Sequence, residues 1–144
     1  ANSARAAGVL SGLPGDKLEQ LYRFGRQLGL AFQVVDDILD FTGDDAQLGK
    51  PAASDLASGY LTAPALYALE ERPALAGLIE REFNEAGDLE QALELVRGCE
   101  AIPRSRELAE GFARDAGEAL TWLPSSEASR ALKGLPDFVL SRLY

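Results

Sequence analysis

The residues best suited to chemistry in this sequence are three aspartates, Asp36, Asp37 and Asp40, which interrupt its most apolar segment. On a helical period of 3.6 residues, Asp36 and Asp40 share one face and Asp37 stands three positions before Asp40. Gln33, one turn earlier, joins the same face. Like charges four residues apart destabilise a helix by roughly 0.2–0.5 kcal/mol, and acids near a helix C-terminus are disfavoured by its dipole. The patch therefore predicts a bound cation.

The chemistry of the donor atoms indicates which cation. The sequence contains no His and one Cys, which excludes an ordinary zinc site. Oxygen ligands alone select a hard ion such as Mg²⁺, which keeps several waters and bridges a few carboxylates to phosphate oxygens. We therefore expect Mg²⁺ and a phosphorylated ligand. The alternative, a solvated helix end, does not explain the apolar residues around the acids, which are Phe32, Val34, Val35, Ile38 and Leu39.

Two polar residues that follow the patch are further candidates. Lys50 lies in a Gly-Lys-Pro segment ten residues after Asp40, and its ammonium group could contact a phosphate or simply be solvated. Asp55 could add a metal or water contact, or cap a turn. An EF-hand is excluded because a loop begun at Asp40 lacks the Gly and Glu at its sixth and twelfth positions. A P-loop is excluded because Pro51 follows Lys50.

Helices must position these residues, because helix-forming Ala and Leu dominate and strand patterns are nearly absent. We expect a long helix over 17–41, capped by Asp16 with Glu19 as its capping-box partner, and central to a bundle because its middle is apolar. Residues 43–59 should form a polar loop. Shorter helices are expected at 4–10, 61–72, 73–85, 88–97 (capped by Asp88) and 102–123, then from Ser125 or Ser126 with a break at Gly134 and Pro136.

Composition excludes several classes of function. With 14 basic and 23 acidic residues the net charge is −9, which argues against nucleic-acid binding. No apolar run approaches the ~18 residues that span a membrane. A lone Cys forms no internal disulfide and fits a reducing compartment, so we expect a cytoplasmic protein, or one of the plastid stroma if the source is a plant. A start inside an expected helix, without Met, indicates a piece of a longer protein.

The chain resembles the trans-prenyltransferases, the polyprenyl diphosphate synthases, in the segments 29–40 (GLAFQVVDDILD), 48–51 (LGKP), 54–56 (SDL) and 61–64 (LTAP). The segments FTG at 41–43 and VLSRLY at 139–144 are similar to long-chain, solanesyl-type members. The resemblance covers nearly the whole chain and aligns it with the C-terminal half of the family's sequence. It implies an all-α helix bundle of the isoprenoid synthase type, of which residues 1–144 would be the C-terminal portion and not a complete domain.

The resemblance also implies a reaction. In this family an allylic diphosphate ionises with the help of Mg²⁺, isopentenyl diphosphate attacks the resulting cation, and a proton is lost. The acids Asp36, Asp37 and Asp40 would hold Mg²⁺ against the allylic diphosphate. Lys50 would contact that diphosphate, and Asp55 would support the metal through water.

Phe32 and Gln33 would line the reacting centre. The chain departs from the family in two respects. The family's first aspartate-rich motif and its basic residues for isopentenyl diphosphate are not in this sequence, and Tyr60 stands where many members have Lys. We therefore expect the chain to require the missing N-terminal half and to be inactive alone, while the parent enzyme is a homodimer as is common in the family.

Two other functions stay open at the level of sequence. One is a non-catalytic helical subunit that pairs with another prenyl diphosphate synthase chain, although such a subunit has no need to keep the aspartates. The other is a terpene cyclase or head-to-head synthase with similar metal chemistry. The Gly-Lys-Pro and Ser-Asp-Leu segments favour the chain-elongating synthases over this last class.

Overall fold

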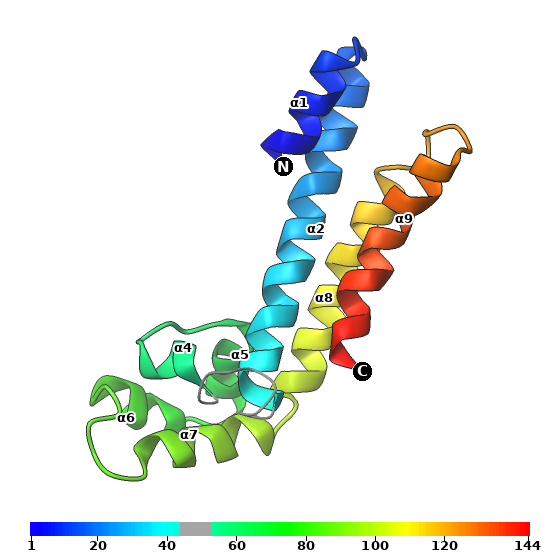
Figure 1. Ribbon diagram of the computed structural model, residues 1–144. Helices are drawn as coiled ribbons and strands as arrows, with labels where there is room; N and C mark the ends of the chain where they lie inside the picture. The colour runs from blue at the N-terminus through cyan, green and yellow to red at the C-terminus, as the bar shows by residue number, and fades with distance from the viewer. Residues whose placement is uncertain (44–52) are drawn as a thin grey trace. The chain divides into compact units, whose positions relative to one another are not determined.

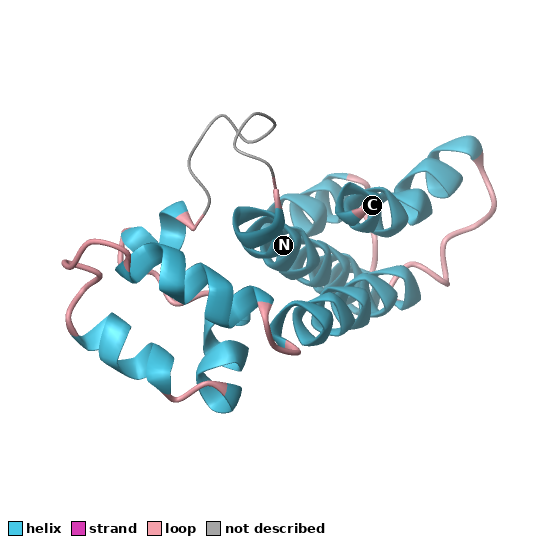
Figure 2. Ribbon diagram, turned by 90° about the horizontal axis from the view of Figure 1, so that it is seen from below, coloured by secondary structure: helices cyan, strands magenta, loops and turns pink. Residues whose placement is uncertain are grey.

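The computed structural model describes residues 1–43 and 53–144, and this part of the chain is built from helices and turns (Figures 1 and 2). No strand occurs within these two ranges, which confirms the predicted all-α class. No helix in the described residues is long and apolar enough to cross a membrane. Lys50, one of the predicted site residues, lies outside the described residues.

The chain divides into two compact units, one made of Ala1–Val35 and Leu108–Tyr144, the other of Asp36–Glu107. Two helices, α2 and α8, each contribute residues to both units. The helices are α1 (Asn2–Leu10), α2 (Gly15–Thr42), α4 (Ser54–Ala57), α5 (Ala63–Glu71), α6 (Ala74–Glu80), α7 (Asp88–Arg97), α8 (Ala101–Glu118) and α9 (Glu127–Leu140), followed by the 3-10 turn η1 (Ser141–Leu143).

The first unit packs α1, most of α2, the end of α8 and α9 around a small apolar core. Helix α1 lies against the beginning of α2 (Figure 1), and a Cβ atom added to Gly8 would lie 2.7 Å from Leu21 Cδ1 and 2.8 Å from Leu18 Cδ2, so a larger residue would require these leucine side chains to shift. The indole N–H of Trp122 donates to the Ala119 carbonyl at 3.0 Å. The buried members of this core are Leu21, Phe24, Ala116, Ala119 and Leu120.

A cation–π contact ties the C-terminal turn of the first unit to α2. The Arg142 guanidinium lies 4.8 Å from the centre of the Phe32 ring. Arg142 belongs to η1, directly after α9. Because the Phe32 side chain is 45% exposed, the contact is a surface one and its strength is modest.

The second unit places the end of α2 in a larger core. Phe41 is fully buried there, and its carbonyl accepts a hydrogen bond from Arg97 Nε at 2.7 Å. The last four carbonyls of a helix lack partners within the helix, and a cation at that end also complements the dipole. Arg97 therefore stabilises the terminus of α2. The other buried residues of this core are Ala53, Leu56, Ala65, Ala68, Leu75, Leu78, Ala92, Val96 and Ala101.

Several predicted helix boundaries are confirmed. Helix α1 ends at Leu10, and α7 spans the predicted residues 88–97. Pro64 stands in the first turn of α5. Ser126 caps α9 through a reciprocal pair, in which Ser126 Oγ accepts from the Ser129 N–H at 3.0 Å and Ser129 Oγ accepts from the Ser126 N–H at 2.9 Å.

Other boundary predictions are wrong. Helix α2 begins at Gly15, so Asp16 lies within its first turn and is not the cap. Helix α9 continues through Gly134 and Pro136 to Leu140. The predicted loop over 43–59 contains the short helix α4.

The ends of α6 and α8 also differ from prediction. Helix α6 stops at Glu80 and not near residue 85, because Glu82 and Phe83 adopt φ values of 57° and 55°. A right-handed helix cannot continue through that left-handed conformation. Helix α8 runs from Ala101 to Glu118 and ends before the predicted residue 123.

An ion pair between Arg81 and Asp88 joins the two ends of the segment that connects α6 and α7. Arg81 donates two hydrogen bonds to the Asp88 carboxylate, from Nε at 2.8 Å and from a terminal nitrogen at 2.6 Å. The N–H of Glu85 donates to the same carboxylate at 3.2 Å. The predicted cap at Asp88 is wrong, because Asp88 is the first residue of α7. The N-cap residue is Gly87, whose φ is 92°. The hydrogen bond from Arg81 holds the pKa of Asp88 below its usual range, and the same contact raises the pKa of Arg81.

The Asp88→Asn substitution is expected to lower the melting temperature at pH 7, because an amide nitrogen then faces the guanidinium donors. The pKa of Asp88 is depressed in the folded state, so its contribution to stability is present above the unfolded value of about 3.9 and is lost as pH falls through the folded value. The difference between the two proteins should therefore shrink below about pH 4. Thermal denaturation, followed by circular dichroism at pH 7 and at pH 3, measures this difference in melting temperature.

Glu85→Gln is the matched control, because Glu85 is exposed and its carboxylate is 4.0 Å from Arg81 Nε. The melting temperature of that variant should equal that of the unmodified protein within experimental error. Equal melting temperatures for Asp88→Asn and the unmodified protein at pH 7 would contradict the assigned role of the pair.

The Phe32→Leu substitution is expected to loosen the C-terminal turn, because leucine has no aromatic face for Arg142. An exposed cation–π contact contributes about 0.5–1 kcal/mol, which corresponds to a roughly twofold to fivefold faster digestion of the terminal residues by carboxypeptidase. Phe138→Leu is the control, since Phe138 is exposed on α9 next to the same turn. Identical digestion rates for the two variants would count against the contact.

Candidate functional site

The predicted site residues on α2 occupy its last turns, as their spacing requires. Phe32 and Gln33 are exposed, and Asp36 is half-buried. Asp37 is 7% exposed and Asp40 is 1% exposed. The structure thus separates the three aspartates by burial, although the sequence treats them as one patch.

The Asp40 carboxylate is held from two sides by the start of α4. Ser54 Oγ donates to Asp40 Oδ1 at 2.9 Å, and the N–H of Asp55 donates to Asp40 Oδ2 at 3.1 Å. The Asp40 carbonyl accepts from the N–H of Ala53 at 2.8 Å. Three consecutive residues, 53–55, are therefore bonded to one residue of α2.

These bonds bring the main chain of Asp55 to the end of α2. Asp55 is half-buried and stands in the first turn of α4. Its carbonyl accepts from the N–H groups of Ser58 at 3.1 Å and Tyr60 at 2.9 Å. The side chain of Tyr60 is 68% exposed, so the main chain and not the ring connects this residue to Asp55.

Three residues next to the predicted site were missed by the sequence reasoning. Ser54 and Arg142 stand inside segments that carry the family resemblance, so a signal for both was present. Arg97, which bonds the end of α2, stands 56 positions after Phe41, and no local pattern connects the two. Ser54 bonds Asp40, while Arg142 brings a positive charge to Phe32.

The acidic side chains at the end of α2 offer only oxygen ligands to a metal ion. Among residues 1–43 and 53–144, no group of three or more His, Cys, Asp or Glu side chains is placed to hold a metal ion. Mg²⁺ does not require such a cage, because one or two carboxylates suffice when water and phosphate oxygens complete its octahedron. The half-buried Asp36 and its neighbour Asp37 supply oxygen ligands of that kind. The residues present therefore fit a hard cation that is shared with a phosphorylated ligand.

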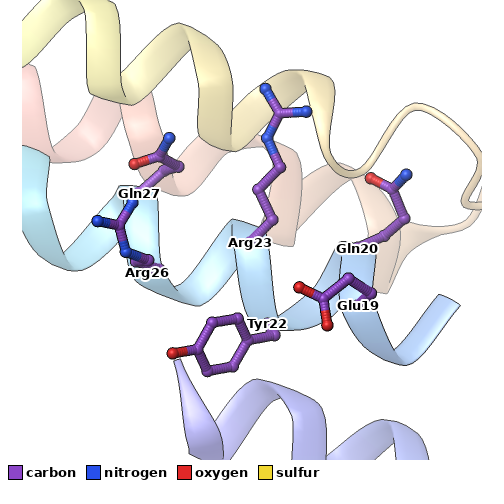
Figure 3. Close-up of a pocket in the computed structure, with 6 residues that line it drawn as sticks. All are labelled: Glu19, Gln20, Tyr22, Arg23, Arg26 and Gln27. Carbon is purple, nitrogen blue, oxygen red and sulfur yellow. The ribbon is translucent and has the colours of Figure 1, made fainter. Parts of the chain in front are cut away.

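A separate hollow lies along the beginning of α2 (Figure 3). Gln27 is buried there, and its Nε2 donates to Asp115 Oδ2 at 3.0 Å. Its Oε1 finds no hydrogen-bond partner in the described residues. Arg23 lies 3.8 Å from the same carboxylate. None of the predicted site residues contributes to this hollow, whose lining is Glu19, Gln20, Tyr22, Arg23, Arg26 and Gln27.

Related proteins were compared with the chain in sequence. A prenyl transferase of Synechocystis sp. is 58% identical over 144 residues, which are 100% of this chain and 45% of that protein. The chloroplastic solanesyl diphosphate synthase 1 of Arabidopsis thaliana is 50% identical over 143 residues, which are 99% of this chain and 35% of that protein. The chain thus spans less than half of the length of these two relatives.

Solved structures with the same fold are also prenyl synthases. An apo medium/long-chain length prenyl pyrophosphate synthase of Arabidopsis matches with a TM-score of 0.87 and 39% identity, covering 99% of this chain and 50% of that one. A polyprenyl synthase of Caulobacter crescentus, complexed with calcium and isoprenyl diphosphate, matches with a TM-score of 0.84 and 36% identity. This match covers 95% of our chain and 43% of the other.

A family comparison agrees with these matches and with the resemblance noted in the sequence. The model of the family described as polyprenyl synthetase matches residues 1–96, which include the patch Asp36, Asp37 and Asp40 on α2 and the start of α4. This span is two thirds of the 144 residues. The chain belongs to the polyprenyl synthetase family.

Proposed function

We propose that the protein containing this chain elongates prenyl diphosphates, by condensing an allylic diphosphate with isopentenyl diphosphate. The observation that carries the proposal is the end of α2, where a half-buried and a buried aspartate offer only oxygen ligands and Asp55 is held close by. The names of the relatives support the reaction class. The Caulobacter relative's complex with calcium and isoprenyl diphosphate supports a hard cation shared with a diphosphate.

Each residue of the site has a role in this proposal. The acidic patch Asp36, Asp37 and Asp40 provides the negative charge, and Asp36 is its most accessible member. Mg²⁺, when bound, would neutralise the charge that develops on the departing diphosphate. Lys50 would contact that diphosphate, and Asp55 would orient a water on the metal.

Phe32 and Gln33 would form the wall beside the reacting carbon atoms. Both are exposed in this chain, which leaves them accessible to a substrate or to further protein. An aromatic face attracts positive charge, and because the Arg142 guanidinium already lies over the Phe32 ring, an allylic cation would lie against its opposite face.

The proposal assigns the activity to a longer protein, because the chain spans 45% of the Synechocystis relative. A single acidic platform can neutralise a diphosphate from one side only. We propose that the remainder of the protein supplies the other side and the binding groups for isopentenyl diphosphate, and that the active form is a homodimer. The alternative is a non-catalytic subunit that completes another synthase chain.

The 144-residue chain alone is expected to show no turnover, because it carries only one side of the proposed metal and diphosphate site. The measurement is incorporation of labelled isopentenyl diphosphate with an allylic primer and Mg²⁺, by this chain and by the longer protein in parallel. Robust elongation by the short chain would overturn this expectation. Elongation only after a different synthase chain is added would favour the alternative.

The Asp36→Asn substitution in the longer protein is expected to lower kcat about a hundredfold, the scale observed when a group that stabilises transition-state charge is removed. The variant should also need more Mg²⁺ for half-maximal rate, since an amide oxygen is a weaker ligand than a carboxylate. Glu90→Gln, an exposed acid in the first turn of α7, is the charge-matched control. An unchanged Mg²⁺ dependence for Asp36→Asn would refute the assigned role.

A further inference from the structure

Asp40 is the most deeply buried of the three aspartates, and its carboxylate is bonded to the start of α4. Both of its oxygens accept hydrogen bonds from the start of α4, and the residue is 1% exposed, whereas Asp36 is half-buried. We propose that Asp40 is a positioning residue that fixes α4 and Asp55 against the end of α2, and that it is not a ligand of the metal. The second half of this statement rests on the proposed function, while the first half does not.

The start of α4 explains why a distant carboxylate is needed. The residue at its N-cap position is Ala53, which has no side chain that could accept a hydrogen bond. An N-cap side chain normally accepts from the N–H of the second or third helical residue. Asp55 is that second residue, and its N–H donates to Asp40. Asp40 therefore serves as the cap of α4 from 15 positions earlier in the chain.

The main chain makes the same connection. The Asp40 carbonyl belongs to the last four of α2, which have no partner within the helix. It accepts from the N–H of Ala53, whose φ of 55° turns the chain into α4. Side chain and main chain of one residue thus hold three successive residues at the start of α4.

The burial of Asp40 favours a role as a helix cap over a role as a metal ligand. A carboxylate has about four lone-pair positions, so two hydrogen bonds alone do not exclude a metal. Bound Mg²⁺, however, keeps several of its waters, and a residue that is 1% exposed leaves no room for a hydrated ion. A buried carboxylate that accepts from an O–H and an N–H group is also already compensated for its lost hydration.

A measurement on the metal-free protein distinguishes the two roles. Replacing a carboxylate whose role is to bind the metal should not loosen the start of α4. Replacing a carboxylate that caps α4 should loosen it. In the full-length protein without Mg²⁺, we expect Asp40→Asn to speed amide hydrogen exchange over residues 53–57 roughly fivefold to tenfold. Asp36→Asn is the matched control and should leave that exchange unchanged or slower.

Ser54→Ala is a milder variant in case Asp40→Asn does not fold. It removes one donor to Asp40 without altering any acid, and should speed exchange in the same peptide by roughly twofold to fivefold. Unchanged exchange in both variants would overturn the inference.

Metal affinity completes the test, with Mg²⁺ and inorganic diphosphate as the probes in titration calorimetry. Asp40→Asn acts on the metal only through the placement of Asp55, so it should lower Mg²⁺ affinity by clearly less than Asp36→Asn, which removes a ligand and should lower it by about tenfold or more. A loss for Asp40→Asn as large as that for Asp36→Asn would overturn the inference, whatever the exchange data give. A normal affinity in Asp36→Asn would instead refute the proposed function, and faster exchange in Asp40→Asn would still establish the cap.

Discussion

The second unit contains a buried carboxylate, that of Asp40, at a helix end whose dipole disfavours negative charge. Asp40 stands near the C-terminus of α2, the end at which the helix dipole is negative, and it is almost fully enclosed. The charge is tolerated because an O–H and an N–H group from α4 bond it. The guanidinium of Arg97 bonds the next carbonyl along the helix. The bonds of residues 53–55 to Asp40 meet this requirement.

This constraint goes with a difference in burial among Asp36, Asp37 and Asp40. A motif with charges at i and i+4 reads as one metal-binding unit, since both positions share a helix face. In the folded chain, burial differs sharply between Asp36 and Asp40, and only the former is accessible to a hydrated ion. A cation that takes one or two carboxylates and completes its shell with phosphate oxygens suits such an arrangement.

Much of the fold was predictable where local rules act alone. The Ser126 cap and Pro64 in the first turn of α5 follow from local hydrogen bonding and fixed dihedral angles. Pro136 shows the limit of such rules. A proline inside a helix costs about 3 kcal/mol, yet Pro136 is buried in α9 and the helix continues. Burial within the first unit stabilises this helix enough to override the local preference.

The sequence by itself determined the all-α class, the family and the oxygen-only donor set, because helical periodicity, motif spacing and residue type are properties of the chain as written. Only the tertiary structure decided which aspartate is accessible and which is a cap. The bonds from Ser54 and Asp55 to Asp40 join positions 14 and 15 residues apart, and Arg97 reaches Phe41 across 56. No local pattern encodes these partners, because they meet only when the apolar core of the second unit has formed.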